Sequence, residues 1–156
     1  MPDAAPTTQP LDRSRVMTAR NAVFVIFALA GLVFASWASR IADTKEALGL
    51  SAGELGMTLF AASVGSVTGL PLAGRISQRI GATRAVALGT AVALSGLLVV
   101  GAVVDAGGSR LALAAGLFLV GLGVGVWDVS MNLEGADVER GLGTAVMPHF
   151  HAAFSG

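Results

Sequence analysis

Four long stretches of the chain contain no ionisable residue, and the charged residues lie in the segments between them. These stretches are Asn21–Ser39, Leu55–Gly74, Ala85–Val104 and Leu111–Trp127. Each reaches or comes close to the ~20 apolar residues that cross a hydrocarbon core of about 30 Å. A helix of a soluble protein would instead carry charges along its outward face. The pattern therefore predicts an all-α integral membrane protein with four spans.

Runs this apolar do not alternate as the strands of a membrane β-barrel must, so helices are expected. Residues 1–20 are rich in Pro, Thr and charge and are predicted to be a disordered tail. Residues 21–156 are predicted to form a partial helical bundle. Its helices are expected at about 21–41, 54–74, 84–104 and 110–134, with the start of a fifth at about 149–156.

Local signals refine these boundaries. Gly49 is a suitable C-cap for a helix that continues beyond the first span. The segment Ser51–Glu54 fits a capping box that opens the second span, and Pro71 is expected to loosen that helix near its end. Residues 152–156 resemble the first turn of a further membrane helix, which suggests the N-terminal part of a longer protein; a helix lying on the membrane surface is the alternative.

Composition agrees with a membrane protein and excludes several function classes. The chain of 156 residues is 54% hydrophobic and 13% charged, with a mean hydropathy of +0.74. The formal net charge is zero, so a nucleic-acid-binding surface is not supported. The absence of Cys removes disulfides, thiolate metal sites and Cys nucleophiles. His149 and His151 would point about 200° apart on a helix, so neither a metal site nor any other cofactor is expected.

The positions of Lys and Arg predict the orientation of the chain. Seven basic residues lie in the tail, in the segment between the second and third spans, or after the fourth span, and three lie on the other side. The positive-inside rule therefore places the N-terminus in the cytoplasm. The expected location is the inner membrane of a bacterial cell.

Small residues mark two faces for close helix packing. Gly65 and Gly69 form a G-x-x-x-G pattern in the second span. At about 100° per residue, Gly121, Gly125, Asp128 and Asn132 fall on one narrow face around the fourth span. The two glycines would let a neighbouring helix, or a solute, come close to the backbone.

Asp128 is the strongest candidate for chemistry. An ionised carboxylate at membrane depth costs about 2.5–3.5 kcal/mol, so its side chain should face protein or water. It is a candidate proton carrier or solute ligand; the alternatives are structural pairing and a solvated residue at the helix end. Asn132 is a weaker candidate, because an intramembrane Asn often only bonds a neighbouring helix.

At the far end of the first span, Ser36, Arg40 and Asp43 share a helical face. Arg40 is a candidate for lining an external vestibule, and Trp37 offers a flat surface on which a sugar ring could stack. The alternative for both is an anchor at the membrane surface, with an interfacial Trp and an Arg that reaches toward the headgroups.

The segment between the second and third spans, 74–84 (GRISQRIGATR), resembles the signature loop of the major facilitator superfamily, G-x-L-A-D-R-x-G-R-[RK]-x. The matching residues are Gly74, Ser77, Arg79, Gly81 and Arg84. The resemblance implies a loop that latches one conformation shut. Gln78 replaces the Asp of the pattern, which puts the charged form of this latch in doubt and leaves a neutral hydrogen-bonding form. The alternative is a basic inside loop without a latch.

A second resemblance covers the exit of the fourth span. Asp128 followed by Asn132, with Ser36–Arg40 and Phe150-His151, is similar to the fucose-permease-like branch of that superfamily and to YbjJ-like bacterial inner-membrane transporters. Membership would imply twelve helices in two halves, with a solute bound near the midplane between them.

We therefore interpret the chain as the N-terminal part of a secondary transporter, with four membrane helices and the start of a fifth. The expected partners are the lipid bilayer, a small solute such as a sugar or a proton-coupled substrate, and the C-terminal half of the transporter. The rival interpretation is a small four-helix membrane protein with a structural or partner-binding role. No nucleophile–base pair supports an enzyme.

Overall fold

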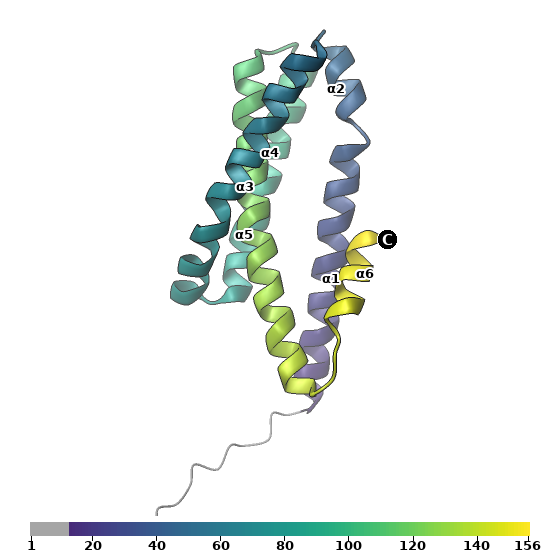
Figure 1. The fold of residues 1–156 in the computed structure, drawn as a ribbon, viewed down its shortest axis with the longest axis vertical. Coiled ribbons are helices and arrows are strands. Elements are labelled where there is room, and N and C mark those ends of the chain that lie inside the picture. The colour runs from purple at the N-terminus through teal and green to yellow at the C-terminus, as the bar shows by residue number, and fades with distance from the viewer. Residues whose placement is uncertain (1–12) are drawn as a thin grey trace, which may run out of the picture.

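The computed structural model describes residues 13–156, which form six helices and no strand (Figure 1). The predicted all-α fold is confirmed. The helices are α1 (Arg13–Ala38), α2 (Ile41–Ala47), α3 (Ala52–Ile80), α4 (Ala82–Asp105), α5 (Arg110–Leu142) and α6 (Met147–Ser155). In Figure 1, α2 and the α4–α5 connection lie at the upper end of the molecule, and the α5–α6 connection lies at the lower end.

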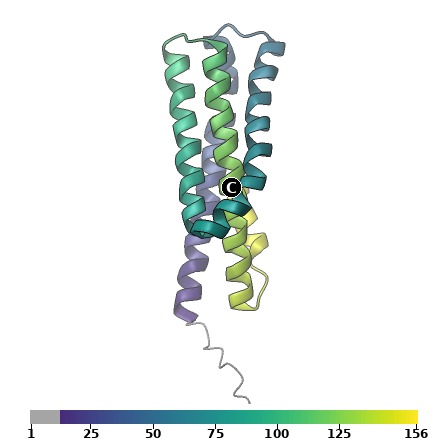
Figure 2. The ribbon, with the colours of Figure 1, turned by 90° about the vertical axis from the view of Figure 1, so that its left-hand side faces the viewer.

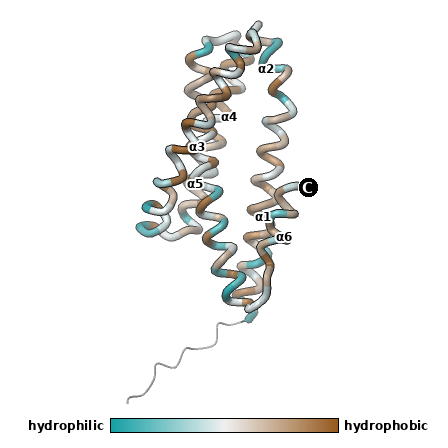
Figure 3. The backbone as a smooth tube through the Cα atoms, viewed as in Figure 1, coloured by the Kyte–Doolittle hydropathy of each residue, from teal (hydrophilic) through white to brown (hydrophobic). Residues whose placement is uncertain are grey.

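Four segments are long and apolar enough to cross a membrane: Arg13–Ala47, α3, α4 and α5. Their large apolar side chains point outward, as Leu32, Met57 and Leu98 show with exposed fractions of 66%, 71% and 75%. Figure 3 shows hydrophobic residues along the helices and hydrophilic ones gathered at α2, the α3–α4 turn and the lower end of α5. A surface that is apolar over this extent needs lipid around it, so the chain is a multi-pass membrane protein.

Helices α3, α4 and α5 form a tightly packed group with α5 in contact with both others. Glycines allow this contact. A Cβ added at Gly69 would lie 2.5 Å from the carbonyl oxygen of Leu122, and one at Gly125 would lie 2.6 Å from that of Ser66. Gly65 and Gly121 meet backbone of the facing helix in the same way. The four glycines thus bring the backbones of α3 and α5 together.

The contact between α4 and α5 uses a second set of glycines that the sequence analysis did not single out. A Cβ at Gly89 would lie 2.6 Å from the amide nitrogen of Trp127, and one at Gly96 would lie 2.6 Å from that of Val120. Gly116 and Gly123 face them from α5. Both pairs are spaced seven residues apart, which is two turns of a helix, so this spacing was a readable signal.

Helix α1 is held mainly near its lower half, where α6 packs beside it (Figure 1). The ring of Phe27 stacks on that of Phe150 with centroids 5.5 Å apart, and both side chains are buried. At Gly31 the backbone of Phe154 lies so close that any side chain would overlap it. Aromatic packing, together with one close backbone approach at Gly31, therefore joins α1 to α6.

The boundaries of α1 differ from the expected ones. The helix begins at Arg13, so residues 13–20 are helical and not a disordered tail; residues 1–12 of that predicted tail lie outside the described residues. It ends at Ala38, and a turn separates it from α2, where a continuous helix was expected. Once a long helix is nucleated by its apolar part, adding polar residues at its end costs little.

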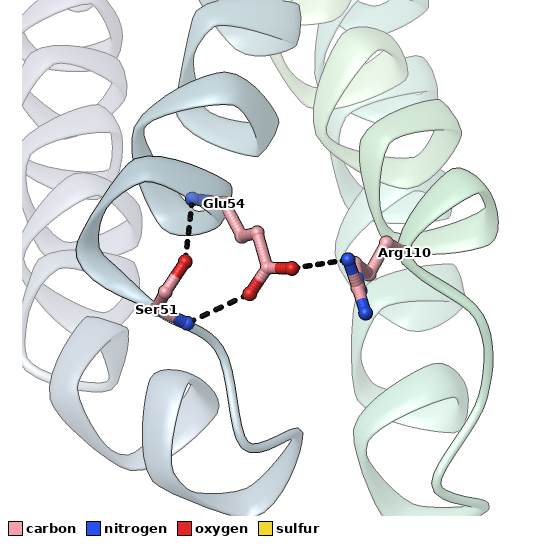
Figure 4. A network of polar contacts seen from close by, with 3 residues as sticks. All are labelled: Ser51, Glu54 and Arg110. Carbon is pink, nitrogen blue, oxygen red and sulfur yellow. Dashed lines mark hydrogen bonds and ion pairs between the residues drawn. The ribbon is translucent and has the colours of Figure 1, made fainter.

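The predicted caps are present. Ser51 accepts a hydrogen bond from the Glu54 amide at 3.3 Å, and the Glu54 carboxylate accepts one from the Ser51 amide at 2.8 Å (Figure 4). The same carboxylate pairs with Arg110 at the start of α5. Gly49 follows α2 with a φ of 59°, as a C-cap glycine should.

Helix α3 remains continuous through Pro71, and Figure 2 shows its lower part bending toward α4. A proline inside a helix removes one backbone hydrogen bond and is a common cause of such a bend. This agrees with the loosening expected there.

Candidate functional site

The main candidate site is a cavity of about 110 Å³ between α1, α4, α5 and α6, which we call the Asp128 cavity. Asp128 is the only ionisable residue among those that line it. The remaining lining residues are apolar or aromatic: Ala30, Val33, Phe34, Trp37, Leu97, Val120, Val124, Trp127, Met131 and Phe154. Among the described residues of this apolar cavity, Asp128 therefore supplies the one charge, and the residue itself is exposed.

A second cavity of about 300 Å³ lies next to the first, toward the upper end of the molecule, and we call it the upper cavity. Trp37 and Leu97 line both cavities. The upper cavity is also lined by Ser36, Arg40 and Asp43. The structure thus brings Arg40, Trp37 and Asp128 along one path, although Arg40 and Asp128 do not line the same cavity.

Asn132 does not line either cavity. Its amide nitrogen donates hydrogen bonds to the backbone oxygen of Asp128 at 2.8 Å and to the Asp128 carboxylate at 3.4 Å. The amide side chain therefore lies beside the carboxylate one helical turn away, where it can hold the carboxylate in place.

His151 is a neighbour of Asp128 that sequence spacing could not assign. Its imidazole meets the edge of the Phe27 ring with centroids 5.3 Å apart, and it lies close enough to the Asp128 carboxylate for an electrostatic interaction. This proximity depends on α6 folding back along α1. The sequence itself placed His151 only two residues from His149.

The predicted polar and glycine face of α5 divides into two parts in the structure. Gly121 and Gly125 contact α3, whereas Asp128 lines the cavity beside α1. The projection placed them within a narrow arc, but three helices surround α5, so neighbouring positions on that arc contact different partners. The glycines serve the helix contact, and Asp128 faces the cavity.

The loop expected between the second and third spans is almost entirely helical, because α3 continues to Ile80 and α4 begins at Ala82, so only Gly81 separates them. Residues 74–84, which we call the α3–α4 turn, contact α5 through hydroxyl groups. The Ser77 and Ser130 hydroxyls lie 3.1 Å apart, and Ser130 is fully buried. The Thr83 hydroxyl donates to the Glu134 carboxylate at 2.7 Å. Ser130 and Glu134 are one turn apart on α5, so the turn docks along one stripe of that helix.

The other residues of the turn face outward. Gln78, Arg79, Gly81 and Arg84 are exposed, Gly74 is half-buried, and Gly81 has the φ of 86° that the sharp turn requires. None of the turn's arginines forms an ion pair with another residue in the range 13–156. The hydroxyl contacts are therefore what attaches this turn to α5.

The structure also identifies Trp127, which sequence analysis passed over in favour of its neighbour Asp128. Its side chain is 5% exposed and lines the Asp128 cavity, yet its Nε1–H has no hydrogen-bond partner among the described residues. Within residues 13–156, no group of three or more His, Cys, Asp or Glu residues is placed to hold a metal ion.

Comparison with known proteins gives two relatives. The chain is 31% identical over 129 residues to an uncharacterised MFS-type transporter of Yersinia pestis, where the match covers 83% of this chain and 33% of the relative. The similarity supports membership in the major facilitator superfamily. The chain is also 31% identical over 141 residues to the uncharacterised transporter y4wD of Sinorhizobium fredii (strain NBRC 101917 / NGR234), covering 90% of this chain and 36% of that protein.

The chain therefore spans about a third of the length of these two relatives. No family model and no solved structure matches it. A transporter role in a membrane is the general function that the relatives support.

Proposed function

We propose that this chain forms part of a secondary transporter that moves a small solute by alternating access. The observation that carries the proposal is the pair of adjoining cavities that share Trp37 and Leu97, with Arg40 lining the upper cavity and Asp128 lining the other. The likeness to named transporters supports it. A path through these cavities would be completed by helices from the rest of the protein, facing the open side of α1 and α5.

Charge placement supports an orientation for this transporter. Arg75, Arg79 and Arg84 lie in or beside the α3–α4 turn, and Arg13 and Arg20 lie in the first turns of α1. By the positive-inside rule both regions belong in the cytoplasm. The upper cavity then opens to the outside of the cell, and the protein belongs in the inner membrane of a bacterium.

Asp128 is the proposed proton carrier. It is the one ionisable group of its cavity, and Asn132 and His151 supply polar neighbours that can accommodate either protonation state. Proton binding would neutralise the Asp128 carboxylate. Its charge otherwise opposes the conformational change between the outward-open and inward-open forms. Transport of the solute would thus be coupled to transport of a proton.

The α3–α4 turn is the proposed latch, in the neutral form that Gln78 suggests. Its contacts with α5, Ser77 to Ser130 and Thr83 to Glu134, lie on the same helix as Asp128. Movement of α5 relative to the turn would have to break both hydrogen bonds. The branch of the superfamily that we propose is the fucose-permease-like one with its YbjJ-like members.

The test uses the complete protein encoded by the gene, reconstituted in liposomes. A panel of small sugars, organic acids and amines is screened for uptake driven by an imposed pH gradient. The Asp128→Asn variant should lose gradient-driven uptake but keep exchange of solute across the membrane, because exchange needs no net proton movement. Asp137→Asn, which removes an exposed carboxylate of α5, is the matched control. Unchanged gradient-driven uptake in Asp128→Asn would remove this carboxyl from the mechanism.

A further inference from the structure

The Asp128 cavity has a wall with very few polar groups. One carboxylate and one indole N–H are set among aliphatic and aromatic side chains. A sugar needs several hydrogen-bond partners around its ring, since each hydroxyl that loses water without a replacement costs free energy. An anionic solute would meet the negative charge of Asp128. The part of the wall that this chain supplies therefore offers few favourable contacts to either class.

Trp127 provides the second polar contact. The side chain is 5% exposed and its Nε1–H lacks a partner in residues 13–156. A buried donor without an acceptor costs about 1–3 kcal/mol, so buried indole groups are normally paired. Because the nitrogen atom itself is buried, an acceptor atom on a bound solute would remove this cost only once the indole turns its N–H into the cavity.

The remaining wall suits a flat apolar body. Phe34 and Phe154 line the cavity with their ring centroids 6.3 Å apart, and Trp37 lies at the boundary with the upper cavity. Aromatic faces attract cations as well as apolar rings. A cavity of about 110 Å³ is small for a ligand, but the upper cavity beyond Trp37 offers a further 300 Å³ or so.

We propose that the Asp128 cavity binds a small amphipathic amine. Its ammonium group pairs with Asp128, a hydrogen-bond acceptor one to three bonds away faces the Trp127 Nε1–H, and its apolar body lies against Phe34, Trp37 and Phe154. The inference rests on the proposed transporter function and names the chemical class of its solute.

The first experiment measures binding to the complete protein in lipid nanodiscs by titration calorimetry. Three probes of equal size differ only in charge: 3-phenylpropylamine, 3-phenylpropan-1-ol and 3-phenylpropanoate. The amine should bind at least tenfold more tightly than the alcohol, and the carboxylate should not bind. In Asp128→Asn the preference for the amine over the alcohol should disappear, but both should still bind weakly through the apolar wall, so exchange at saturating amine concentrations should persist.

Two further variants make this result specific. Asp128→Glu keeps a carboxylate and should retain the preference, which shows that a loss in Asp128→Asn comes from charge rather than misfolding. Asp137→Asn removes a carboxylate of the same helix that lies outside the cavity, and it should bind all three probes as the unmodified protein does.

The second experiment tests Trp127 with a pair of amines that differ in one atom. In 2-phenoxyethylamine an ether oxygen replaces one CH₂ of 3-phenylpropylamine, so only the former offers an acceptor. The ether should bind about threefold or more tightly, and Trp127→Phe should abolish this difference while leaving the amine preference intact.

The outcomes separate the two proposals. Equal binding of the amine, alcohol and carboxylate probes, or an amine preference that survives Asp128→Asn, overturns the amine assignment and leaves transport by the protein standing. Tight, Asp128-dependent amine binding without uptake or exchange of the amine in liposomes supports the site and overturns the transporter function.

Discussion

The two sides of α5 are packed in different ways. Toward α3 and α4, glycines bring backbones into contact, and a Cβ added at Gly69 or Gly96 would meet main-chain atoms at 2.5–2.7 Å. Toward α1 and α6, the α5 side chains of Trp127 and Met131 pack in a cluster with Phe27 and Phe150, and cavities remain between the helices. Backbone contacts cannot adjust without moving whole helices, whereas side chains can change rotamer.

This difference suggests that the two groups of helices differ in how far they can move. Helices α3, α4 and α5 are expected to move as one body, because any sliding would drive backbone atoms together. Helices α1 and α6 are expected to shift against that body, because the cavities beside Asp128 leave room. A solute site between the rigid group (α3, α4 and α5) and the adjustable pair (α1 and α6) can be exposed or covered with little loss of stability.

The largest loss of stability is expected when the backbone contact between α3 and α5 is blocked. In Gly121→Leu, the new side chain would overlap the carbonyl oxygen of Ala62. Overpacking usually costs about 1–3 kcal/mol and more when the obstacle is main chain, so we expect about 3 kcal/mol or more and a large loss of folded protein. The measurement is the fraction of monodisperse protein after detergent extraction.

Gly56→Leu is the control for this substitution. Nothing lies within 4 Å of a Cβ at Gly56, and the residue is exposed on α3. The control should be extracted as the unmodified protein is. Equal yields of the two variants would show that α3 and α5 are not packed through Gly121.

The next largest effect is expected at the side-chain contact between α1 and α6. Phe150 is 1% exposed and stacks on Phe27, so Phe150→Ala removes a buried ring from the contact between α6 and α1. Large-to-small changes of buried Phe cost about 3 kcal/mol. Hydrogen exchange should show faster exchange in α1 and α6 while α3, α4 and α5 remain protected, because the two regions open separately.

Phe60→Ala is the matched control, since Phe60 is 61% exposed and faces outward from α3. It should change neither region measurably. Faster exchange across all helices in Phe150→Ala would mean that the molecule opens as one unit, and the contrast between the two sides of α5 would be lost.

A smaller effect is expected at the docking of the α3–α4 turn. Ser130→Ala removes the buried hydroxyl that faces Ser77. A neutral hydrogen bond contributes about 1 kcal/mol. Because both hydroxyls belong to the same contact, Ser77→Ala with Ser130→Ala should cost less than the sum of the single changes. Unfolding of the three variants in denaturing detergent gives this coupling, and strictly additive costs would show that the two residues do not interact.

Much of this architecture was predictable from the sequence. Apolar stretches without charges located all four long helices, because lipid tolerates no uncompensated charge along a helix face. The capping box at Ser51 and Glu54 was readable because it depends on residues three positions apart. The proximity of Trp37 and Asp128 could not be predicted in the same way, since it depends on how α1 packs against α5.

The site residues that the sequence analysis did not identify were missed for one physical reason. His151 lies by Asp128 only because α6 turns back along α1, and the turn is held where the Glu139 carboxylate accepts hydrogen bonds from the Val146 and Met147 amides at 2.8 and 2.9 Å. Trp127 matters because its indole N–H has no hydrogen-bond partner within residues 13–156. Contacts and unpaired groups are properties of the packed molecule, which spacing along one helix cannot show.

The smallest effects are expected at the upper end of the rigid group, where two interactions of Glu54 can be separated (Figure 4). Ser51→Ala removes the side chain that caps α3, and loss of an N-cap costs about 1 kcal/mol. Glu54→Gln keeps an oxygen for the Ser51 amide but weakens the ion pair with Arg110. The Arg110 side chain is 66% exposed, and such pairs contribute only about 0.2–1 kcal/mol.

Ser51→Ala should therefore lower the unfolding free energy more than Glu54→Gln does, and only the Glu54→Gln difference should shrink in high salt. The reverse order would mean that the ion pair between α3 and α5, rather than the local cap, holds this end of the rigid group together.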